Sequence, residues 1–139
     1  MKIVINDTFG GFGLSYEGVM KYAELKNIKL YAFVDGRNEV GNLDFHAPKI
    51  PYDGTGDAFI VHYSQKPLKD GKYEEDSYFS ERDIERTDPA LIKTVKLLGK
   101  KANGRCASLK IIEIPDNVEW QVEEYDGLEH IAEKHQTWN

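Results

Sequence analysis

Short apolar runs separated by polar turns give the first outline of this chain. The run KIVIN at residues 2–6 is typical of a buried strand, and β-rich segments recur at 28–34 and 57–63. Residues 108–114 and 118–125 follow as two more strands, predicted to form an antiparallel pair joined by a short turn. The pattern therefore predicts a mostly antiparallel sheet of about five strands.

Two segments carry helical signals at both the apolar positions and the ends. Apolar side chains recur at helical spacing over residues 16–23, and Ser15 is placed to cap that helix. A second helix is predicted from Pro89, which suits the first helical position, with Thr87 or Asp88 as its cap. Its apolar positions, which should face the core, are Leu91, Ile92, Val95 and Leu98.

The carboxy-terminal segment DGLEHIAEKH predicts a third helix. Asp126 can serve as its cap, with Glu129 three positions later, and an apolar stripe would run through Leu128, Ile131, Ala132 and His135, with Trp138 closing the core. With about three helices and about five strands, the predicted fold class is α+β. The 139 residues are expected to form a single domain.

Residues 35–57 break the pattern of regular elements. This segment holds four glycines and two prolines, yet apolar residues are scattered through it. It is predicted to be a long irregular excursion of the domain that serves as a lid or as an oligomer contact.

Composition and charge exclude several classes of protein. The chain has 18 basic and 24 acidic residues, and its net charge of −6 opposes general binding to nucleic acid phosphates. No stretch approaches the roughly 18 apolar residues of a membrane span, so a cytoplasmic protein with no membrane partner is expected. The single cysteine, Cys106, excludes an internal disulfide. No spacing of residues predicts a cofactor or a metal site.

The stretch FGGFG at residues 9–13 lies where a strand should turn into a helix. Backbone N–H groups in such a loop can bind an anion such as a phosphate. The spacing matches neither the dinucleotide-binding glycine pattern nor the phosphate-binding loop that ends in lysine. Phe9 and Phe12 remain open to two interpretations, because they can stack on a nucleobase or pack beneath the helix.

An acidic corner near the carboxy-terminus forms a second group of candidate residues. Its acid–base side chains are Glu123, Glu124, Tyr125, Asp126, Glu129, His130 and His135. A histidine beside a glutamate is a plausible proton-transfer pair. The spacing of His130 and His135 does not place two histidines on one helix face, which excludes a zinc-protease pattern. The alternative is structural, with the glutamates on the solvated side of a strand.

Arg86 and Asp88 precede the second predicted helix. Arg86 can bind a phosphate or carboxylate of a ligand through two parallel hydrogen bonds, helped by Arg82 or Arg105. An ion pair with a nearby Asp or Glu of the protein is the competing interpretation.

Several of these segments together resemble a known family. KIVIN followed by FGGFGLS, with RTDPALI in the middle and EW, EEYDG, AEKH and TW near the end, is similar to a family of small phage and prophage proteins that has no assigned activity. The resemblance spans nearly the whole chain and implies a phage accessory protein acting in the cytoplasm of a bacterial host. Because such proteins frequently counter host defence, it favours binding over catalysis, by analogy alone.

Three hypotheses for function follow. The first is a small-molecule-binding protein, expected as a homo-oligomer, that sequesters a nucleotide-derived immune signal of the host. The second is an inhibitor that binds a host defence protein through residues 35–57 and an acidic surface, and the third is a hydrolase that uses a His/Glu pair. For the first, the predicted ligand-binding residues are Phe9, Gly10, Gly11, Phe12, Gly13, Ser15, Arg86, Asp88, Glu123, Tyr125 and His130.

Overall fold

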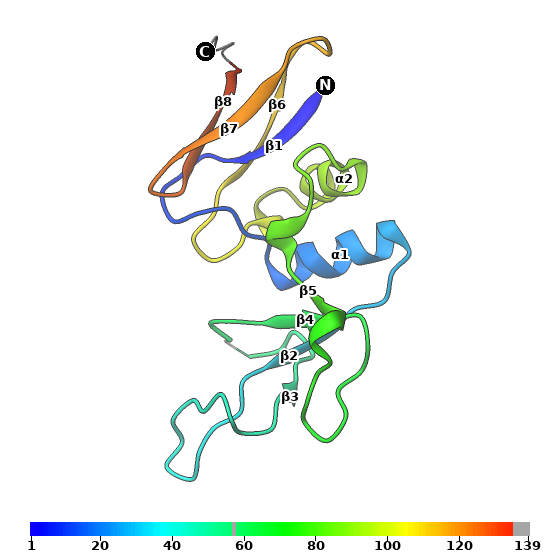
Figure 1. The fold of residues 1–139 in the computed structure, drawn as a ribbon, viewed down its shortest axis with the longest axis vertical. Helices are drawn as coiled ribbons and strands as arrows, with labels where there is room; N and C mark the ends of the chain where they lie inside the picture. Colours follow the sequence, from blue (N-terminus) through cyan, green and yellow to red (C-terminus); the bar gives the residue numbers. More distant parts are fainter. Residues whose placement is uncertain (57, 135–139) are drawn as a thin grey trace, which may run out of the picture. The chain divides into compact units, whose positions relative to one another are not determined.

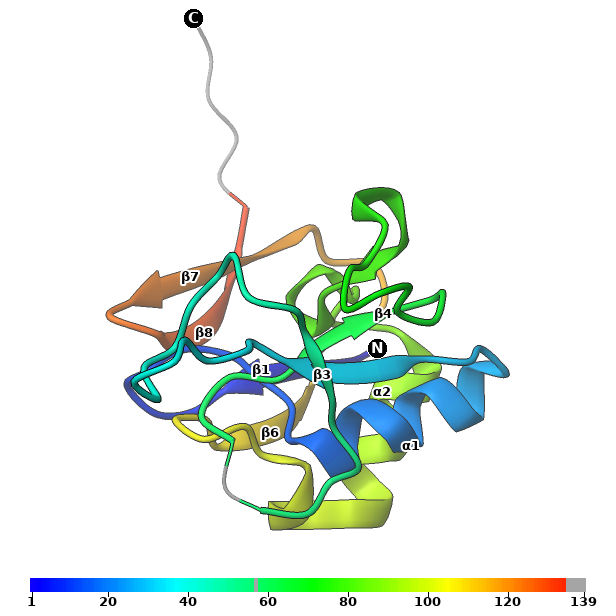
Figure 2. The same ribbon diagram turned by 90° about the horizontal axis from the view of Figure 1, so that it is seen from below.

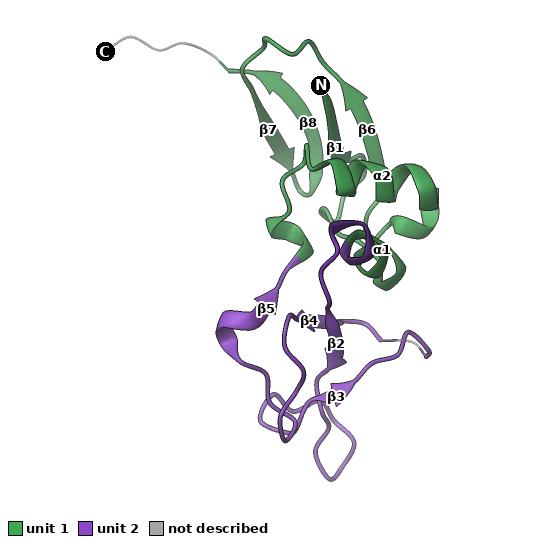
Figure 3. Ribbon diagram, turned by 90° about the vertical axis from the view of Figure 1, so that its right-hand side faces the viewer, with its two compact units in different colours: residues 1–22, 81–139 green, residues 23–80 purple. Residues whose placement is uncertain are grey.

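The structure, a computed structural model, describes residues 1–56 and 58–134. The chain divides into two compact units, unit 1 with residues 1–22 and 81–139 and unit 2 with residues 23–80 (Figure 3). The predicted α+β class is confirmed. The described residues form eight short strands in three antiparallel sheets, two α-helices and three short 3-10 helices. The prediction of about five strands and three helices is therefore wrong in its counts.

The centre of unit 1 is the strand pair β1 (Lys2–Asn6) and β6 (Leu109–Glu113). The two strands are antiparallel, with Val4 opposite Ile111 (Figures 1 and 2). Four of the five β1 residues are buried, including both faces of the strand, because α2 and β8 both contact it. The second edge of β1 is held by the backbone of Arg86, whose carbonyl accepts a hydrogen bond from the N–H of Val4 at 2.9 Å.

The strands β7 (Trp120–Tyr125) and β8 (Leu128–Glu133) form a hairpin, so the predicted helix over 126–135 is wrong. Asp126 and Gly127 form the two-residue turn, and both have positive φ, 49° and 87°. This is the turn chemistry that an Asp-Gly pair favours between antiparallel strands. The buried residue of β8 is Glu129, near the start of the strand, and a buried acid hides the strand alternation from a hydrophobicity pattern. His135 and Trp138 lie outside the described residues.

The predicted pairing of residues 108–114 with residues 118–125 is also wrong. β6 pairs with β1, and β7 pairs with β8. A turn between consecutive segments indicates only that the chain changes direction, and the pairing partner is decided by which apolar faces can be buried together.

Two helices complete unit 1. In α2 (Pro89–Leu98), Asp88 is the N-cap and accepts a hydrogen bond from the N–H of Ala90, as predicted. Leu91 and Val95 are buried, and the helix packs against β1 and β6. The helix α1 (Tyr16–Lys26) begins after Ser15, whose hydroxyl accepts a hydrogen bond from the N–H of Gly18, and its last turn belongs to unit 2. The 3-10 helices η2 (Glu81–Asp83) and η3 (Gly99–Ala102) flank α2 in the sequence.

Unit 2 is built on a small antiparallel sheet. Its strands, in spatial order, are β3 (Ile50–Pro51), β2 (Tyr31–Val34), β4 (His62–Ser64) and β5 (Tyr78–Phe79). Phe33 in β2 and Tyr63 in β4 are buried, and η1 (Glu75–Ser77) leads into β5. The polar segment 66–83 also contributes to this sheet, because Tyr78 and Phe79 of β5 pair with β4.

Much of the excursion at 35–57 is irregular, as predicted. In its described part, only β3 and one isolated bridge between Arg37 and Leu43 interrupt turns and bends. Four large apolar side chains in it are exposed: Val40, Leu43, Phe45 and Ile50. No helix in the part of the chain that the structure describes is long and apolar enough to cross a membrane.

Candidate functional site

The candidate site of unit 1 is centred on an ion pair between Arg86 and Glu129. Nη1 and Nη2 of Arg86 donate to Oε1 and Oε2 of Glu129 at 2.6 and 2.9 Å, so the pair is bidentate. Both side chains are largely buried, with exposed fractions of 17% and 4%. The guanidinium of Arg86 also lies over the ring of Phe12, 3.8 Å from its centroid. Arg86 is thus held from two sides, by a carboxylate and by an aromatic face.

The environment of Glu129 keeps this carboxyl ionised. Burial acts to raise its pKa, but the hydrogen bonds from Arg86 and from the backbone N–H of Asn6 outweigh that effect and hold the pKa of Glu129 below its usual value. Three N–H donors therefore satisfy the two carboxylate oxygens. The pair is a fixed dipole in the site rather than a proton donor at neutral pH.

Asn6, at the end of β1, connects the segments around this ion pair. Its side-chain amide donates to the carbonyls of Thr8 and Gly127, both at 2.7 Å, and its Oδ1 accepts from the N–H of Ser108 at 2.9 Å. The residue is fully buried, and every polar atom of its side chain is used. A single asparagine thus joins the start of the glycine loop, the β7–β8 turn and the segment before β6.

The glycine loop and the hairpin turn approach each other at backbone distance. The N–H of Gly10 donates to the carbonyl of Asp126 at 3.1 Å. A Cβ on Gly127 would lie 2.7 Å from the backbone nitrogen of Gly10 and closer still to that of Gly11. Gly10 and Gly11 have φ values of 116° and 99°, which strongly favour glycine. Gly10 and Gly11 are therefore favoured by their positive φ, and a Cβ on Gly10 would also lie 2.6 Å from the carbonyl oxygen of Cys106, whereas the close approach of the loop to the hairpin requires glycine at residue 127.

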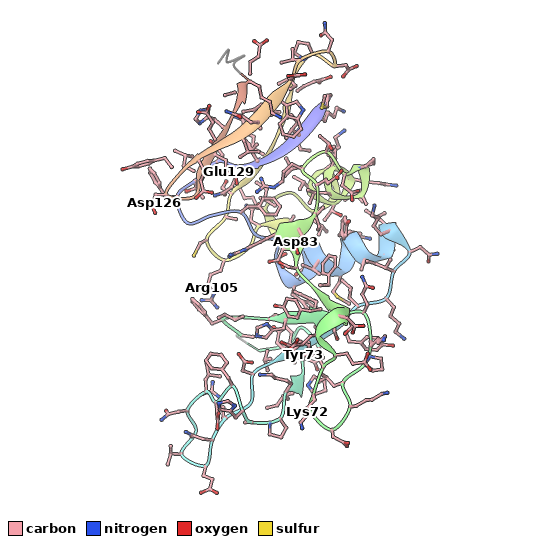
Figure 4. The ribbon with its side chains drawn as sticks, viewed as in Figure 1. Lys72, Tyr73, Asp83, Arg105, Asp126 and Glu129 are labelled. Atoms are coloured by element: carbon pink, nitrogen blue, oxygen red, sulfur yellow. The ribbon has the colours of Figure 1, made fainter. Side chains whose placement is uncertain are left out.

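A pocket of about 400 Å³ opens beside this contact. This volume falls in the range of small-molecule sites. Two arginines, three carboxylates, one aromatic ring and three glycines line it: Arg82, Arg86, Glu124, Asp126, Glu129, Phe12, Gly10, Gly11 and Gly127. Figure 4 labels Asp126 at the tip of the β7–β8 hairpin and Glu129 further along β8. All nine residues belong to unit 1.

The charges of the pocket decide which ligand groups it can accept. Arg86 is paired with Glu129, and the lining also contains the carboxylates of Glu124 and Asp126 and the guanidinium of Arg82, all three on exposed residues. One oxygen of Glu124 accepts from the N–H of Gly127 at 3.2 Å. The carboxylates of the lining thus offer acceptors for N–H and O–H donors of a ligand.

The two phenylalanines of the loop have different positions. Phe12 is 5% exposed and lies beneath Arg86, in the core. Phe9 is 57% exposed, and its ring meets that of Tyr125 edge-on at 6.5 Å between centroids. Phe9 and Tyr125 directly precede lining residues in the sequence, but neither of these two predicted site residues is among those that line the pocket.

Five other predicted site residues have structural contacts away from the lining. Ser15 and Asp88 are helix caps, and Asp88 also accepts a hydrogen bond from the hydroxyl of Tyr22 at 2.8 Å. Glu123 and His130 form a pair across the hairpin, 3.2 Å apart between Oε2 and Nε2, with both side chains well exposed. Gly13 accepts a backbone hydrogen bond from Gly104. The structure therefore brings together Gly10, Gly11, Phe12 and Arg86 of the predicted set.

Sequence reasoning missed the residues that complete the pocket. Asn6 carries no motif, and Glu124, Asp126 and Glu129 appeared only as members of an acidic corner predicted to be helical. The signal that could have placed them is Asp126-Gly127, since reading it as a hairpin turn puts Glu124 opposite Glu129. Within residues 1–56 and 58–134, no group of three or more His, Cys, Asp or Glu side chains is arranged to hold a metal ion.

Comparison of the chain with protein-family models, with curated protein sequences and with solved structures gave no significant match.

Proposed function

We propose that this chain is a small-molecule-binding protein whose pocket in unit 1 holds a nucleotide-derived ligand. The observation that carries the proposal is the pocket of about 400 Å³ in which an arginine fixed over an aromatic ring, two carboxylates and the glycine loop meet. The resemblance to phage accessory proteins supports a role in the bacterial cytoplasm, where sequestering such a ligand would remove a signal of host defence.

The pocket suits the base and sugar of a nucleotide better than its phosphates. Nucleobases and riboses carry N–H and O–H donors, which the carboxylates of Glu124 and Asp126 can accept. A planar guanidinium such as that of Arg86 is a stacking surface for an aromatic base. A phosphate would be repelled by the carboxylates of Glu124 and Asp126.

Isothermal titration calorimetry and thermal-shift measurements with nucleosides, mononucleotides, cyclic dinucleotides and ADP-ribose test this proposal. A ligand that binds the folded protein raises the midpoint of thermal unfolding in a concentration-dependent way. If none of these ligands shifts the midpoint, at micromolar protein and millimolar ligand, the proposal fails.

Two conservative variants report on the pocket itself. Glu124→Gln keeps the acceptor for the Gly127 N–H, and Asp126→Asn keeps a residue type that tolerates positive φ, so both should fold. Each removes one lining charge and should weaken binding by about tenfold, the equivalent of one hydrogen bond to a charged group. The matched control is Glu123→Gln, because Glu123 neighbours Glu124 in β7 but pairs with His130 outside the lining. Equal effects of all three variants would count against the pocket.

A second candidate function is contact with a host protein through the excursion at 35–57. The observation that favours it is the exposure of Val40, Leu43, Phe45 and Ile50, with exposed fractions from 50% to 80%. Exposed apolar residues gathered in one segment mark interaction surfaces. Binding driven by this segment should persist at high salt and be lost in Leu43→Ser/Phe45→Ser, whereas binding through the acidic surface should weaken steeply with salt.

A further inference from the structure

A chain of hydrogen bonds in unit 2 links a tyrosine, a histidine and a buried carboxylate. The hydroxyl of Tyr78 in β5 lies 3.0 Å from Nδ1 of His62 in β4, and Nε2 of His62 lies 3.3 Å from Oδ2 of Asp35, just after β2. The other carboxylate oxygen of Asp35 accepts from Nζ of Lys49 at 2.7 Å. Four residues from different parts of the chain are thus joined in one network, which the sequence patterns did not indicate.

The burial of these groups increases from one end of the network to the other. Tyr78 is 43% exposed, the side chain of His62 is 23% exposed and that of Asp35 is 8% exposed. Burial acts to raise the pKa of Asp35, but the hydrogen bonds from Lys49 and His62 outweigh it and keep the pKa low, so the carboxylate is ionised. The reactive end therefore faces solvent while the anionic end is fixed inside.

Aromatic packing fixes the imidazole ring. Phe33 stacks on His62, with centroids 5.4 Å apart and an interplanar angle of 25°, and it is the partner of His62 across β2 and β4. Tyr73, labelled in Figure 4, stacks in turn on Phe33, with ring centroids 5.2 Å apart. The ring of His62 is therefore held between a carboxylate and a hydroxyl by contacts that do not depend on either of them.

We propose that Tyr78 is an activated nucleophile, with His62 as its general base and Asp35 as the positioning residue, and that this cluster accepts an acyl group from an activated ester. The geometry is that of a nucleophile within hydrogen-bond reach of a base that a third group orients. In the neutral tautomer that the contacts favour, Nε2–H of His62 donates to Asp35, and Nδ1 accepts from the Tyr78 hydroxyl. This proposal is independent of the pocket in unit 1.

The transfer step balances without any further reagent. The phenolic oxygen of Tyr78 attacks the ester carbonyl carbon, and its proton passes to Nδ1 of His62. The resulting tetrahedral oxyanion collapses, the bond to the leaving alcohol breaks, and His62 returns the proton to that alcohol. The acyl group has then moved from the ester oxygen to the oxygen of Tyr78, and the transient imidazolium is stabilised by Asp35.

A neutral acyl donor fits this cluster better than a phosphoryl donor. Phosphoryl transfer relies on cations that offset the charge of the transferred group. The ammonium in the network is that of Lys49, and Asp35 already binds it. Attack on an uncharged ester requires only a base and a nucleophile, and the network contains both.

Acylation of the intact protein by para-nitrophenyl acetate, followed by peptide mapping with mass spectrometry, tests the proposal. Tyr125 is the internal reference, because it is 78% exposed and would react first if exposure alone decided the rate. General-base assistance should make Tyr78 react at least about tenfold faster than Tyr125. A rate at Tyr78 equal to or below that at Tyr125 would overturn the proposal.

Two variants separate activation from structure. In His62→Gln the rate at Tyr78 should fall to that of Tyr125, and the rate at Tyr125, measured in the same molecules, should stay unchanged. In Asp35→Asn the rate at Tyr78 should fall, and the pH at which it levels off should move down, because the imidazolium loses the carboxylate beside it. Retention of the fast rate in His62→Gln would show that His62 is not the base, and an unchanged pH profile in Asp35→Asn would remove Asp35 from the mechanism.

Discussion

Arg86 and Glu129 are 43 residues apart in the sequence, yet they form a bidentate ion pair in which every carboxylate oxygen has an N–H donor. The pair joins the segment before α2 to the start of β8. It therefore connects two of the segments whose residues line the pocket. Loss of the pair should lower the stability of unit 1 first, and weaken ligand binding only as a consequence.

Replacing Arg86 by Met should destabilise unit 1 by about 3 kcal/mol or more, because it leaves the Glu129 carboxylate buried without its main partner. Urea denaturation followed by circular dichroism measures the free energy of unfolding. Lys66→Met is the matched control, since it breaks the exposed pair of Lys66 with Glu74 and should have a much smaller effect. Equal losses in the two variants would contradict the structural role of Arg86.

The same ion pair predicts how stability depends on pH. The pKa of Glu129 is lowered in the folded state from its reference value of 4.5, so the folded protein holds this proton less tightly than the unfolded chain. The stabilisation is therefore present above the reference value and is lost as the pH falls below it toward the folded pKa. The difference in unfolding free energy between the wild type and Glu129→Gln should become smaller as the pH falls from about 6 to about 3, which is roughly the range in which carboxyls titrate. Urea denaturation at each pH measures this difference. A constant gap would show that Glu129 does not titrate as described.

Gly127→Ala should destabilise the protein more than Gly99→Ala. Both glycines have positive φ, so both variants share the cost of a strained backbone. The new Cβ at residue 127 would also collide with the backbone of Gly10 and Gly11, whereas nothing lies within 4 Å of a Cβ at residue 99. The difference in thermal midpoint between the two variants therefore isolates the contact of the glycine loop with the hairpin. If the two midpoints agree, the loop and the turn do not meet as closely as described.

Asp88→Ala should cost about 1 to 2 kcal/mol of stability, because α2 loses its N-cap and the hydroxyl of Tyr22 loses its acceptor. Burial raises the pKa of Tyr22, as do the hydrogen bond to Asp88 and its charge, so the variant should also let Tyr22 ionise at lower pH in an absorbance titration. Asp88→Asn retains an acceptor for the Ala90 N–H and should lose less stability. If Asp88→Asn loses as much stability as Asp88→Ala, the effect comes from the charge of Asp88 rather than from its capping hydrogen bond.

Local signals in the sequence determined much of the secondary structure. The strand at 2–6, the helix after Ser15 and the helix that begins at Pro89 follow from runs of apolar residues and from capping side chains, which act within a few residues of each other. The irregular course of much of 35–57 follows in the same way, from its glycines and prolines. For these elements the deciding energies are local, and the pattern is sufficient.

The tertiary structure alone decided the course of residues 126–134 and the composition of the site. A helical stripe and a strand with one buried acid give similar patterns, and the choice depends on whether Glu129 finds Arg86 and the N–H of Asn6 across the chain. The FGGFG stretch was identified from the sequence as a turn, but the backbone that it contacts, that of the 126–127 turn, is more than 100 residues away. In unit 2, Asp35, His62 and Tyr78 meet because β2, β4 and β5 are neighbours in one sheet. Desolvation and long-range pairing set these positions, and no local pattern encodes them.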